Sequence, residues 1–429
     1  MIESIRIRDF RGIQSGAIDR LRQLNILVGP NNSGKSTVLE ALYLAATASR
    51  PATCTVRYRH SDQPGRETTC DVLASAPDLL GDHPMKRLWA RHNYVGLPPG
   101  LSEWSQGFVQ VSLRDQGLPF AALDLYAGER GFSQGEEQVT ALLGIGPLPQ
   151  AETRKQRPPS PDAVGLFATE LLGSDAEPLA DSRVVFCWQP ELSYYYRGSS
   201  AWLLQGAPAV AEHTLFFDAD AMQRHIPLGF YQRMLGRVPG WTQRIAQAFG
   251  RVFKIDRPFG VQFVPTGTDG QLVQGWIAPE DRPAIPIDAF GDGARSAFKL
   301  LTYLTALTTI AGSDAPGLLL WEEPELYQHP QTLALLLQEV ANLVRGKPVQ
   351  VFISTHSLEV LAQVTTMLQS EQLGAEDVLL FRLDLRDGRL NSSWFNRDNL
   401  VTWLESGWDP RTWQEFVSPV QFRLRQEEA

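Results

Sequence analysis

The chain has 429 residues, of which 43% are hydrophobic, so it is long enough for one large globular domain or two to three ordinary ones. No apolar run approaches the ~20 residues that a membrane-spanning helix needs, and the N-terminus alternates apolar with charged residues, unlike a signal peptide. The three cysteines, Cys54, Cys70 and Cys187, are too few and too far apart for a disulfide framework or a metal site. The net charge of -9 argues against a surface that is wholly a nucleic-acid groove. We expect a cytoplasmic protein with no membrane partner.

The first residues predict a strand from Ser4 to Asp9, a turn at Arg11 and Gly12, and a second strand that ends at Val28. Apolar and charged residues alternate in the first strand, which is typical of a strand with one solvated face. A basic patch that contacts DNA is the alternative interpretation, and its members would be Arg6, Arg8, Arg11, Arg20 and Arg22. Both interpretations stay open.

The run GPNNSGKST matches the Gly-x-x-x-x-Gly-Lys-Ser pattern of a phosphate-binding P-loop. A short buried strand is predicted before it, at 25–28, and an amphipathic helix after it, from Ser36 to Ala48. We expect Lys35 to contact the β- and γ-phosphates and the Ser36 hydroxyl to ligate magnesium. A glycine-rich turn between strand and helix is the alternative. The predicted nucleotide-binding residues are Gly29, Pro30, Asn31, Asn32, Ser33, Gly34, Lys35, Ser36 and Thr37.

The middle of the chain, from Pro51 to about Arg282, has an irregular pattern rich in proline and glycine. The proline-rich stretch at 147–162 predicts an exposed loop or a disordered linker. No heptad run survives for three or four repeats, which excludes a long coiled coil. The elements predicted here are strands at Phe108–Leu113, Ala121–Leu125, Val184–Trp188 and Thr214–Asp218, helical periodicity over Leu228–Phe253 with a break at Pro239 and Gly240, and a hairpin of Gly260–Pro265 with Gln271–Ile277.

The C-terminal third alternates strands with helices, which indicates a parallel sheet. Its predicted helices are Ala294–Ile310, Pro330–Val344 and Leu358–Leu368, and its predicted strands are Leu318–Trp321, Val349–Ile353 and Val378–Leu383. A turn at Arg386 to Gly388 and short helices near Leu400 and Trp413 follow.

Three further segments complete the predicted site. An apolar strand delivers Glu322 and Glu323 to its C-terminal end, where ligands bind in open parallel sheets, so we expect Glu322 to hold magnesium and Glu323 to polarise the attacking water. His356 ends the next strand, where it could hydrogen-bond the γ-phosphate. The run FGDGARS, at 290–296, opens a helix, and its glycines free the backbone to approach an anion. The alternatives are an exposed turn at the two glutamates and an ordinary capped helix at 290–296.

The order of IRIRDFRGI, GPNNSGKST, FGDGARS, EEPELYQHP and STHS resembles the ATPase heads of the ABC superfamily, most of all the branch with RecF, SMC and OLD-type proteins. The resemblance implies an α/β fold: a mixed or parallel sheet core with an antiparallel β lobe, and a large irregular α+β insertion. The core would comprise 1–50 and 283–390, the insertion 51–282, and a C-terminal helical extension 391–429.

The resemblance also implies a head-to-tail homodimer around two ATP molecules. A signature motif would close over the ATP of the partner copy, Arg11 would lie near the nucleotide, and Pro324–Pro330 would lie at the dimer junction. Glu322 stands where many relatives have aspartate, and Gln106 and Gln110 are candidates for a coupling glutamine. The signature residues are Gly291, Asp292, Gly293, Ala294 and Arg295.

The expected function is that of a magnesium-dependent ATPase that switches a bacterial DNA-related system, in antiphage defence or DNA repair, with a separate effector protein. The residues after His356 lack the Glu-Gly and Asp-x-Asp arrangement of a fused nuclease. An ATP-gated scaffold with negligible hydrolysis and the ATPase subunit of a transporter remain alternatives. Partner recognition would lie in the insertion, with the run at 194–197 as one candidate surface.

Overall fold

The computed structural model describes residues 1–48, 78–81, 211–267, 270–407 and 409–411, together with Arg87 and Arg91. Between Pro51 and Arg197 it also describes the backbone of strands β4 to β10. The predicted linker at 147–162, Gln106 and the predicted helix near Trp413 lie outside the described residues. No helix in the described ranges is both long and apolar enough to cross a membrane.

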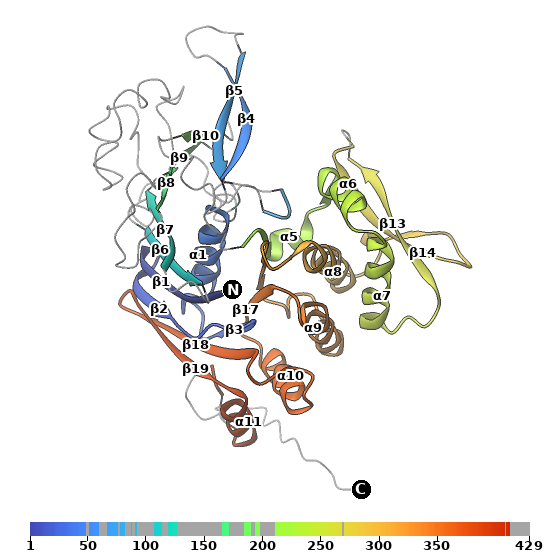
Figure 1. Cartoon of the computed structure of the whole chain (residues 1–429). Helices are drawn as coiled ribbons and strands as arrows, with labels where there is room; N and C mark the ends of the chain where they lie inside the picture. Colours follow the sequence, from blue (N-terminus) through green and yellow to red (C-terminus); the bar gives the residue numbers. More distant parts are fainter. Residues whose placement is uncertain are drawn as a thin grey trace.

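A thirteen-stranded mixed sheet organises the molecule (Figure 1). Its parallel part contains five strands in the order β18, β3, β17, β16 and β11. Their bounds are Val378–Arg386, Leu24–Val28, Val349–Ser354, Gly317–Glu322 and His213–Phe217. Most residues of these strands are apolar and buried, because the parallel part of the sheet is covered on both faces.

The other part of the sheet is antiparallel and runs from β2 through β1 and β6 to the edge strand β10. The bounds are Ile2–Phe10 for β1, Ile13–Ile18 for β2, Gly107–Leu113 for β6, Pro119–Tyr126 for β7, Gly165–Glu170 for β8, Val184–Gln189 for β9 and Tyr194–Arg197 for β10. Strand β19 (Arg389–Phe395) joins the two parts, since it pairs antiparallel with β18 and parallel with β2. This architecture confirms the predicted α/β class with an antiparallel lobe. A separate hairpin contains β4 (Pro51–Arg59) and β5 (Glu67–Ser75).

Helix α1 (Lys35–Ala48) lies inside the curve of the sheet and packs against strands of both parts, including β1, β6, β11 and β16 (Figure 1). Helices α8 (Asp292–Ile310), α9 (Pro330–Val344) and α10 (Leu358–Gln369) cover the other face. Their apolar side chains form one core with Ile26 and Val28, which alternate along β3 with residues that face α1. The sheet is therefore sandwiched between α1 and these helices. Helix α11 (Arg397–Glu405) follows β19 and contacts α10.

A smaller lobe packs on α8 through an aromatic core. Trp241 stacks on Phe263 with 5.4 Å between ring centroids and donates a 3.2 Å hydrogen bond from Nε1 to the carbonyl oxygen of Thr302. Gly240 adopts φ 68° between two helices, at the predicted break. The lobe comprises α5 (Ala219–Gln223), β12 (Ile226–Pro227), α6 (Leu228–Arg237), α7 (Trp241–Phe253), β13 (Phe259–Thr266), β14 (Leu272–Pro279), β15 (Ile285–Pro286) and the short helix Ile287–Ala289.

Two sequence-based boundaries differ from the structure. Strand β11 falls within the range 51–282, yet it pairs with β16 as an edge strand of the main sheet. The first residues of 391–429, the predicted helical extension, complete β19, in which Leu390 and Phe395 are buried, and α11 then forms at the helix predicted near Leu400. The residues between these two positions are mostly polar and none is buried, so the strand has no continuous apolar run in the sequence.

Candidate functional site

The predicted P-loop connects β3 to α1 and encloses the amine of Lys35. Gly29 has φ 147°, and a Cβ atom there would overlap the carbonyl oxygen of Leu383, so only glycine fits. The Lys35 Nζ donates 2.9 Å hydrogen bonds to the carbonyl oxygens of Gly29 and Pro30. Burial lowers the pKa of Lys35, and the opposing charges of nearby glutamates offset this effect in part. Pro30, Asn31 and Asn32 are exposed at the tip, Ser33 and Gly34 are buried, and Thr37 is half-buried.

The end of β16 brings the predicted metal acid to the start of α1. Glu322 Oε1 accepts a hydrogen bond from the Ser36 hydroxyl at 2.5 Å. Its neighbour Glu323 has φ 50°, in the left-handed region, and its N–H donates to the carbonyl oxygen of Ser354 at 2.8 Å. This turn directs the two adjacent carboxyl groups differently: the side chain of Glu322 is 14% exposed and that of Glu323 is 44% exposed.

His356 follows β17 and lies beside two carboxylates. Its Nδ1 is 3.5 Å from Glu323 Oε1 and 3.6 Å from Glu325 Oε1. Glu325 Oε1 also accepts hydrogen bonds from the Thr355 hydroxyl, at 2.8 Å, and from the His356 N–H, at 3.2 Å. Glu325 was not among the predicted site residues, although it belongs to the EEPE run, where it stands two positions after Glu323. Glu325 thus links the turn after β16 to the turn after β17, which contains His356.

The predicted signature segment begins α8 and packs against residues 324–330. A Cβ atom on Gly293 would lie 2.7 Å from the carbonyl oxygen of Tyr327, and Gln328 Nε2 donates to the carbonyl oxygen of Gly293 at 3.0 Å. Gly291 is exposed, Asp292 pairs with Arg295, and Ala294 is half-buried. Within the described residues, no hydrogen bond or ion pair joins 291–295 to 29–37.

Of the five arginines near the N-terminus, Arg11, Arg20 and Arg22 each have a partner among the described residues. Arg11 has φ 54°, and its guanidinium pairs with Glu40, one helical turn after Ser36 on α1. Arg22 pairs with Glu376 at 3.5 Å, and the Arg20 guanidinium lies over the ring of Trp394. Arg6 is exposed, and the side chain of Arg8 lies outside the described residues.

A buried ion network behind Glu322 includes residues that the sequence did not predict. Arg91 bonds to Glu40, Asp218 and Glu322, while Arg87 bonds to Asp78 and Asp218. Burial alone would lower the pKa of Arg91, but the three carboxylates raise it well above the ordinary arginine value. Burial alone would raise the pKa of Asp218, but the two arginines hold it below its usual value. Arg91 therefore stays charged.

Gln110, a candidate for a coupling residue, lies in β6 opposite Arg6 of β1. It stands in the middle of the antiparallel part of the sheet. Among the described residues of 51–282, Arg91 is the one whose side chain bonds to Glu322. A solitary arginine in an irregular stretch has no local signal that distinguishes it, which is why the sequence did not reveal it.

The residues present suit a magnesium nucleotide. The glycine conformation of the P-loop leaves its backbone free to follow a phosphate chain, and Lys35 supplies a desolvated cation. Ser36 and Glu322 offer the hard oxygen atoms that Mg²⁺ prefers. No group of three or more histidine, cysteine or acidic residues that could hold a metal occurs among the described residues, and Mg²⁺ bound to phosphates needs no such group.

Two family matches cover both halves of this site. Residues 1–73 match the family described as "AAA ATPase domain", and residues 200–362 match the family described as "AAA domain, putative AbiEii toxin, Type IV TA system". The first range includes the P-loop, and the second includes 291–295, Glu322, Glu323 and His356. Both parts of the site thus lie in stretches that match AAA ATPase families.

Curated relatives match over short segments. The chain is 46% identical over 54 residues to an ATP/GTP phosphatase of Helicobacter pylori, which is 12% of this chain and 15% of the relative. It is 49% identical over 45 residues to the DNA double-strand break repair Rad50 ATPase of Methanopyrus kandleri, which is 10% of this chain and 5% of the relative. The chain therefore spans only a small part of these relatives.

Among solved structures, an SMC head bound to the C-terminal winged-helix domain of ScpA aligns with 94% of this chain and 99% of its own, at 11% identity and a TM-score of 0.45. The SMC head domain from Thermotoga maritima aligns with 91% of this chain and 98% of its own, at 11% identity and a TM-score of 0.39.

Proposed function

We propose that this chain, which matches AAA ATPase families in both parts of the site, binds ATP and hydrolyses it with Mg²⁺ held by Ser36 and Glu322. The observation that supports this proposal is the 2.5 Å contact between the Ser36 hydroxyl and the Glu322 carboxylate. This contact joins the helix start that would receive phosphates to the strand end that would hold the metal. Bound Mg²⁺ would neutralise charge on the phosphate chain.

The residues of the chain have separate roles in this proposal. Lys35 and the P-loop N–H groups bind the phosphates, because a helix N-terminus and a partly buried cation both favour anions. Glu323, which is nearly half exposed, is the base that orients and polarises the attacking water. His356 lies 3.5 Å from the Glu323 carboxylate and would hydrogen-bond the γ-phosphate.

Substitution of the base separates hydrolysis from binding. We expect Glu323→Gln to keep ATP binding and to lower ATP turnover at least a hundredfold, because general-base catalysis commonly contributes about 10²–10⁴ in rate. Lys35→Ala should lose ATP binding itself. Phosphate release and the binding of a fluorescent ATP analogue are the measurements. Unchanged turnover in Glu323→Gln would exclude this base. Negligible turnover in a wild-type protein that binds ATP would favour the alternative of an ATP-gated scaffold.

A head-to-tail dimer is the proposed active assembly. The start of α8 presents Gly291 to solvent, where a Cβ atom would meet nothing within 4 Å. Two large apolar side chains are exposed beside it: Phe290 at 37% and Tyr327 at 43%. Exposed apolar side chains that lie together favour contact with another protein. A second copy would place its P-loop there, so that two chains complete two ATP sites.

The proposed context is a bacterial DNA-related switch, in antiphage defence or repair, with an effector supplied by another chain. One relative is named for DNA double-strand break repair and one matching family for a toxin system, and these names support this context. A DNA-binding titration at increasing salt, with and without ATP, tests the DNA component. Phosphate contacts weaken steeply as salt rises, so no binding at low salt would exclude DNA as a partner.

A further inference from the structure

We propose that Arg91 is a positioning residue for the metal acid: it fixes one carboxylate oxygen of Glu322 so that the other oxygen faces Ser36. This inference rests on the proposed Mg²⁺ and ATP function. Arg91 comes from the irregular middle of the chain, outside the segments that contain the P-loop and the acidic strand. It therefore makes the geometry of the metal site depend on the range 51–282, where partner recognition is expected.

Each of three guanidinium nitrogens bonds to a different carboxylate. Arg91 Nε donates to Glu40 Oε1 at 2.7 Å, Nη1 donates to Asp218 Oδ2 at 2.7 Å, and Nη2 donates to Glu322 Oε2. The acceptors come from α1, from the residue after β11 and from the end of β16. A planar guanidinium presents its donors in a fixed fork, so the three bonds together determine its position and orientation.

Two of the three acceptors are themselves immobilised in the protein interior. The side chains of Glu40 and Asp218 are 0% and 2% exposed. Asp218 Oδ1 also accepts from the N–H of Ala221 at 2.9 Å and from Arg87 Nη2 at 3.0 Å, and Glu40 also pairs with Arg11. Moving Arg91 away would leave the buried carboxylates of Glu40 and Asp218 with less neighbouring positive charge, which would destabilise the folded protein. The arginine is anchored on the interior side, and Glu322 is the acceptor at the functional site.

The length of Glu322 fits this arrangement. Its Oε1 accepts from the Ser36 hydroxyl at 2.5 Å while its Oε2 accepts from Arg91. Both oxygens are thus engaged, and the side chain has a single defined direction. An aspartate is shorter by one methylene group and would not span both partners. The pairing with Arg91 explains why a glutamate can serve as the metal acid here without being free to rotate.

Arg87 provides a matched comparison on the same segment. It is buried, and it bonds to Asp78 and Asp218 and to the carbonyl oxygen of Phe216. Its guanidinium and that of Arg91 both lie over the ring of Phe216, at 5.2 and 5.0 Å from the centroid. The two arginines share the structural environment. Of the two, Arg91 makes the contact with Glu322.

The test measures how Mg²⁺ affects nucleotide binding in the full chain. A fluorescent ATP analogue is titrated into wild type, Arg91→Met, Arg91→Lys and Arg87→Met, first in EDTA and then at increasing Mg²⁺. Loss of a group that orients a metal ligand commonly weakens metal affinity about 10- to 100-fold. We expect Arg91→Met to raise the Mg²⁺ midpoint by about tenfold or more with little change of affinity in EDTA. Arg91→Lys should recover part of this shift, and Arg87→Met should lower thermal stability without moving the midpoint.

Substitutions of the acid distinguish positioning from general destabilisation. Glu322→Asp should shift the Mg²⁺ midpoint by itself, and adding Arg91→Lys to it should produce no further shift, because the shortened side chain no longer reaches the arginine. This pair keeps a cation at position 91, so it remains measurable if Arg91→Met fails to fold. A wild-type midpoint in Arg91→Lys and Arg91→Met, or an equal shift in Arg87→Met, would overturn the inference alone. Absence of nucleotide binding by wild type would overturn the proposed function and this inference with it.

Discussion

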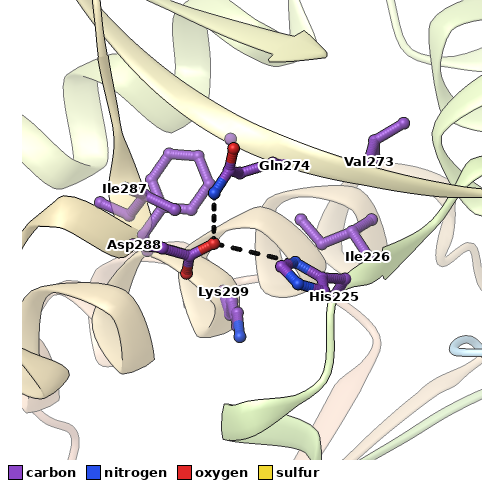
Figure 2. A pocket seen from close by; sticks show the side chains of 9 residues that line it. His225, Ile226, Val273, Gln274, Ile287, Asp288 and Lys299 are labelled. Atoms are coloured by element: carbon purple, nitrogen blue, oxygen red, sulfur yellow. Dashed lines mark hydrogen bonds and ion pairs between the residues drawn. The ribbon is translucent and has the colours of Figure 1, made fainter. Parts of the chain in front are cut away.

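Lys299 lies on α8 with its ammonium group in the protein interior. Its side chain is 3% exposed, and Nζ donates hydrogen bonds to the carbonyl oxygens of Met222, at 2.8 Å, and Gln223, at 3.1 Å. Figure 2 shows it at a small cavity beside Asp288, which accepts from Gln274 Nε2 at 2.5 Å and lies 3.8 Å from His225 Nδ1. Burial lowers the pKa of Lys299 to about 8, because desolvation and nearby Arg295 outweigh the attraction of Asp288.

This shift predicts a stability gain with rising pH. Between about pH 8 and 10.5 the unfolded chain holds a proton on Lys299 that the folded chain releases, so folding becomes more favourable as pH rises through this window. Relative to Lys299→Met, we expect the wild type to gain up to roughly 3 kcal/mol of unfolding free energy from pH 7.5 to pH 10.5.

Urea denaturation of both proteins at the two pH values measures this gain. Lys347→Met, at an exposed lysine, is the control for loss of the charge itself. An equal difference between wild type and Lys299→Met at both pH values would contradict the prediction.

At the scale of elements, the local patterns of the sequence predict most of the parallel core. The apolar run 318–321 became β16, and the periodicity from Pro330 to Val344 became α9 with the same bounds. The break at Gly240 separates two helices as expected, because glycine readily adopts the left-handed conformation found there. The formation of these elements depends mainly on residues near one another in the chain, so the pattern of a single sequence is enough to predict them.

The places of β11 and β19 in the sheet depend on distant partners. β11 joins the core only because its residues 213–217 lie in register with 317–321 of β16, and β19 exists because it pairs with β18 and β2. The same limit applies to the site. Ser36 and Glu322 were expected together from their motifs, whereas Arg91 has no motif and reaches Glu322 only through tertiary structure.

The packing of β14 on α8 gives a prediction at this scale. A Cβ atom on Gly275 would overlap the buried ring of Phe298, which belongs to α8. We expect Gly275→Ala to lower the unfolding free energy by about 1–3 kcal/mol, the usual cost of overpacking a core. Gly260→Ala is the matched control on the neighbouring strand β13, since its Cβ would have 4.0 Å to the nearest atom. Equal chemical denaturation midpoints for both variants would show that α8 can move away from the hairpin.

At the scale of the whole molecule, the proposed dimer depends on the exposed surface at the start of α8. We expect a Glu323→Gln chain to form an ATP-dependent dimer, and the further change Phe290→Asp to reduce dimer formation at least tenfold while ATP binding is kept. The reason is that a charge would replace an apolar side chain that is 37% exposed beside the signature segment. Light scattering after size-exclusion chromatography measures the mass with and without ATP.

Leu235→Asp is the matched control, because Leu235 is an exposed apolar residue on α6. It should leave the dimer intact. A dimer that persists in Phe290→Asp would place the interface elsewhere on the molecule.

The position of β19 has a consequence for how this chain reaches its native state. Ser15 of β2 lies opposite Arg389, and β3, which leads into the P-loop, lies between β17 and β18. The strand before the P-loop therefore obtains both neighbours only from strands that are synthesised long after it. Contacts between residues so distant in sequence slow folding, because a long loop must close before they form. During synthesis, the P-loop therefore emerges before β17 and β18, and both strands are complete only once residue 386 has been translated.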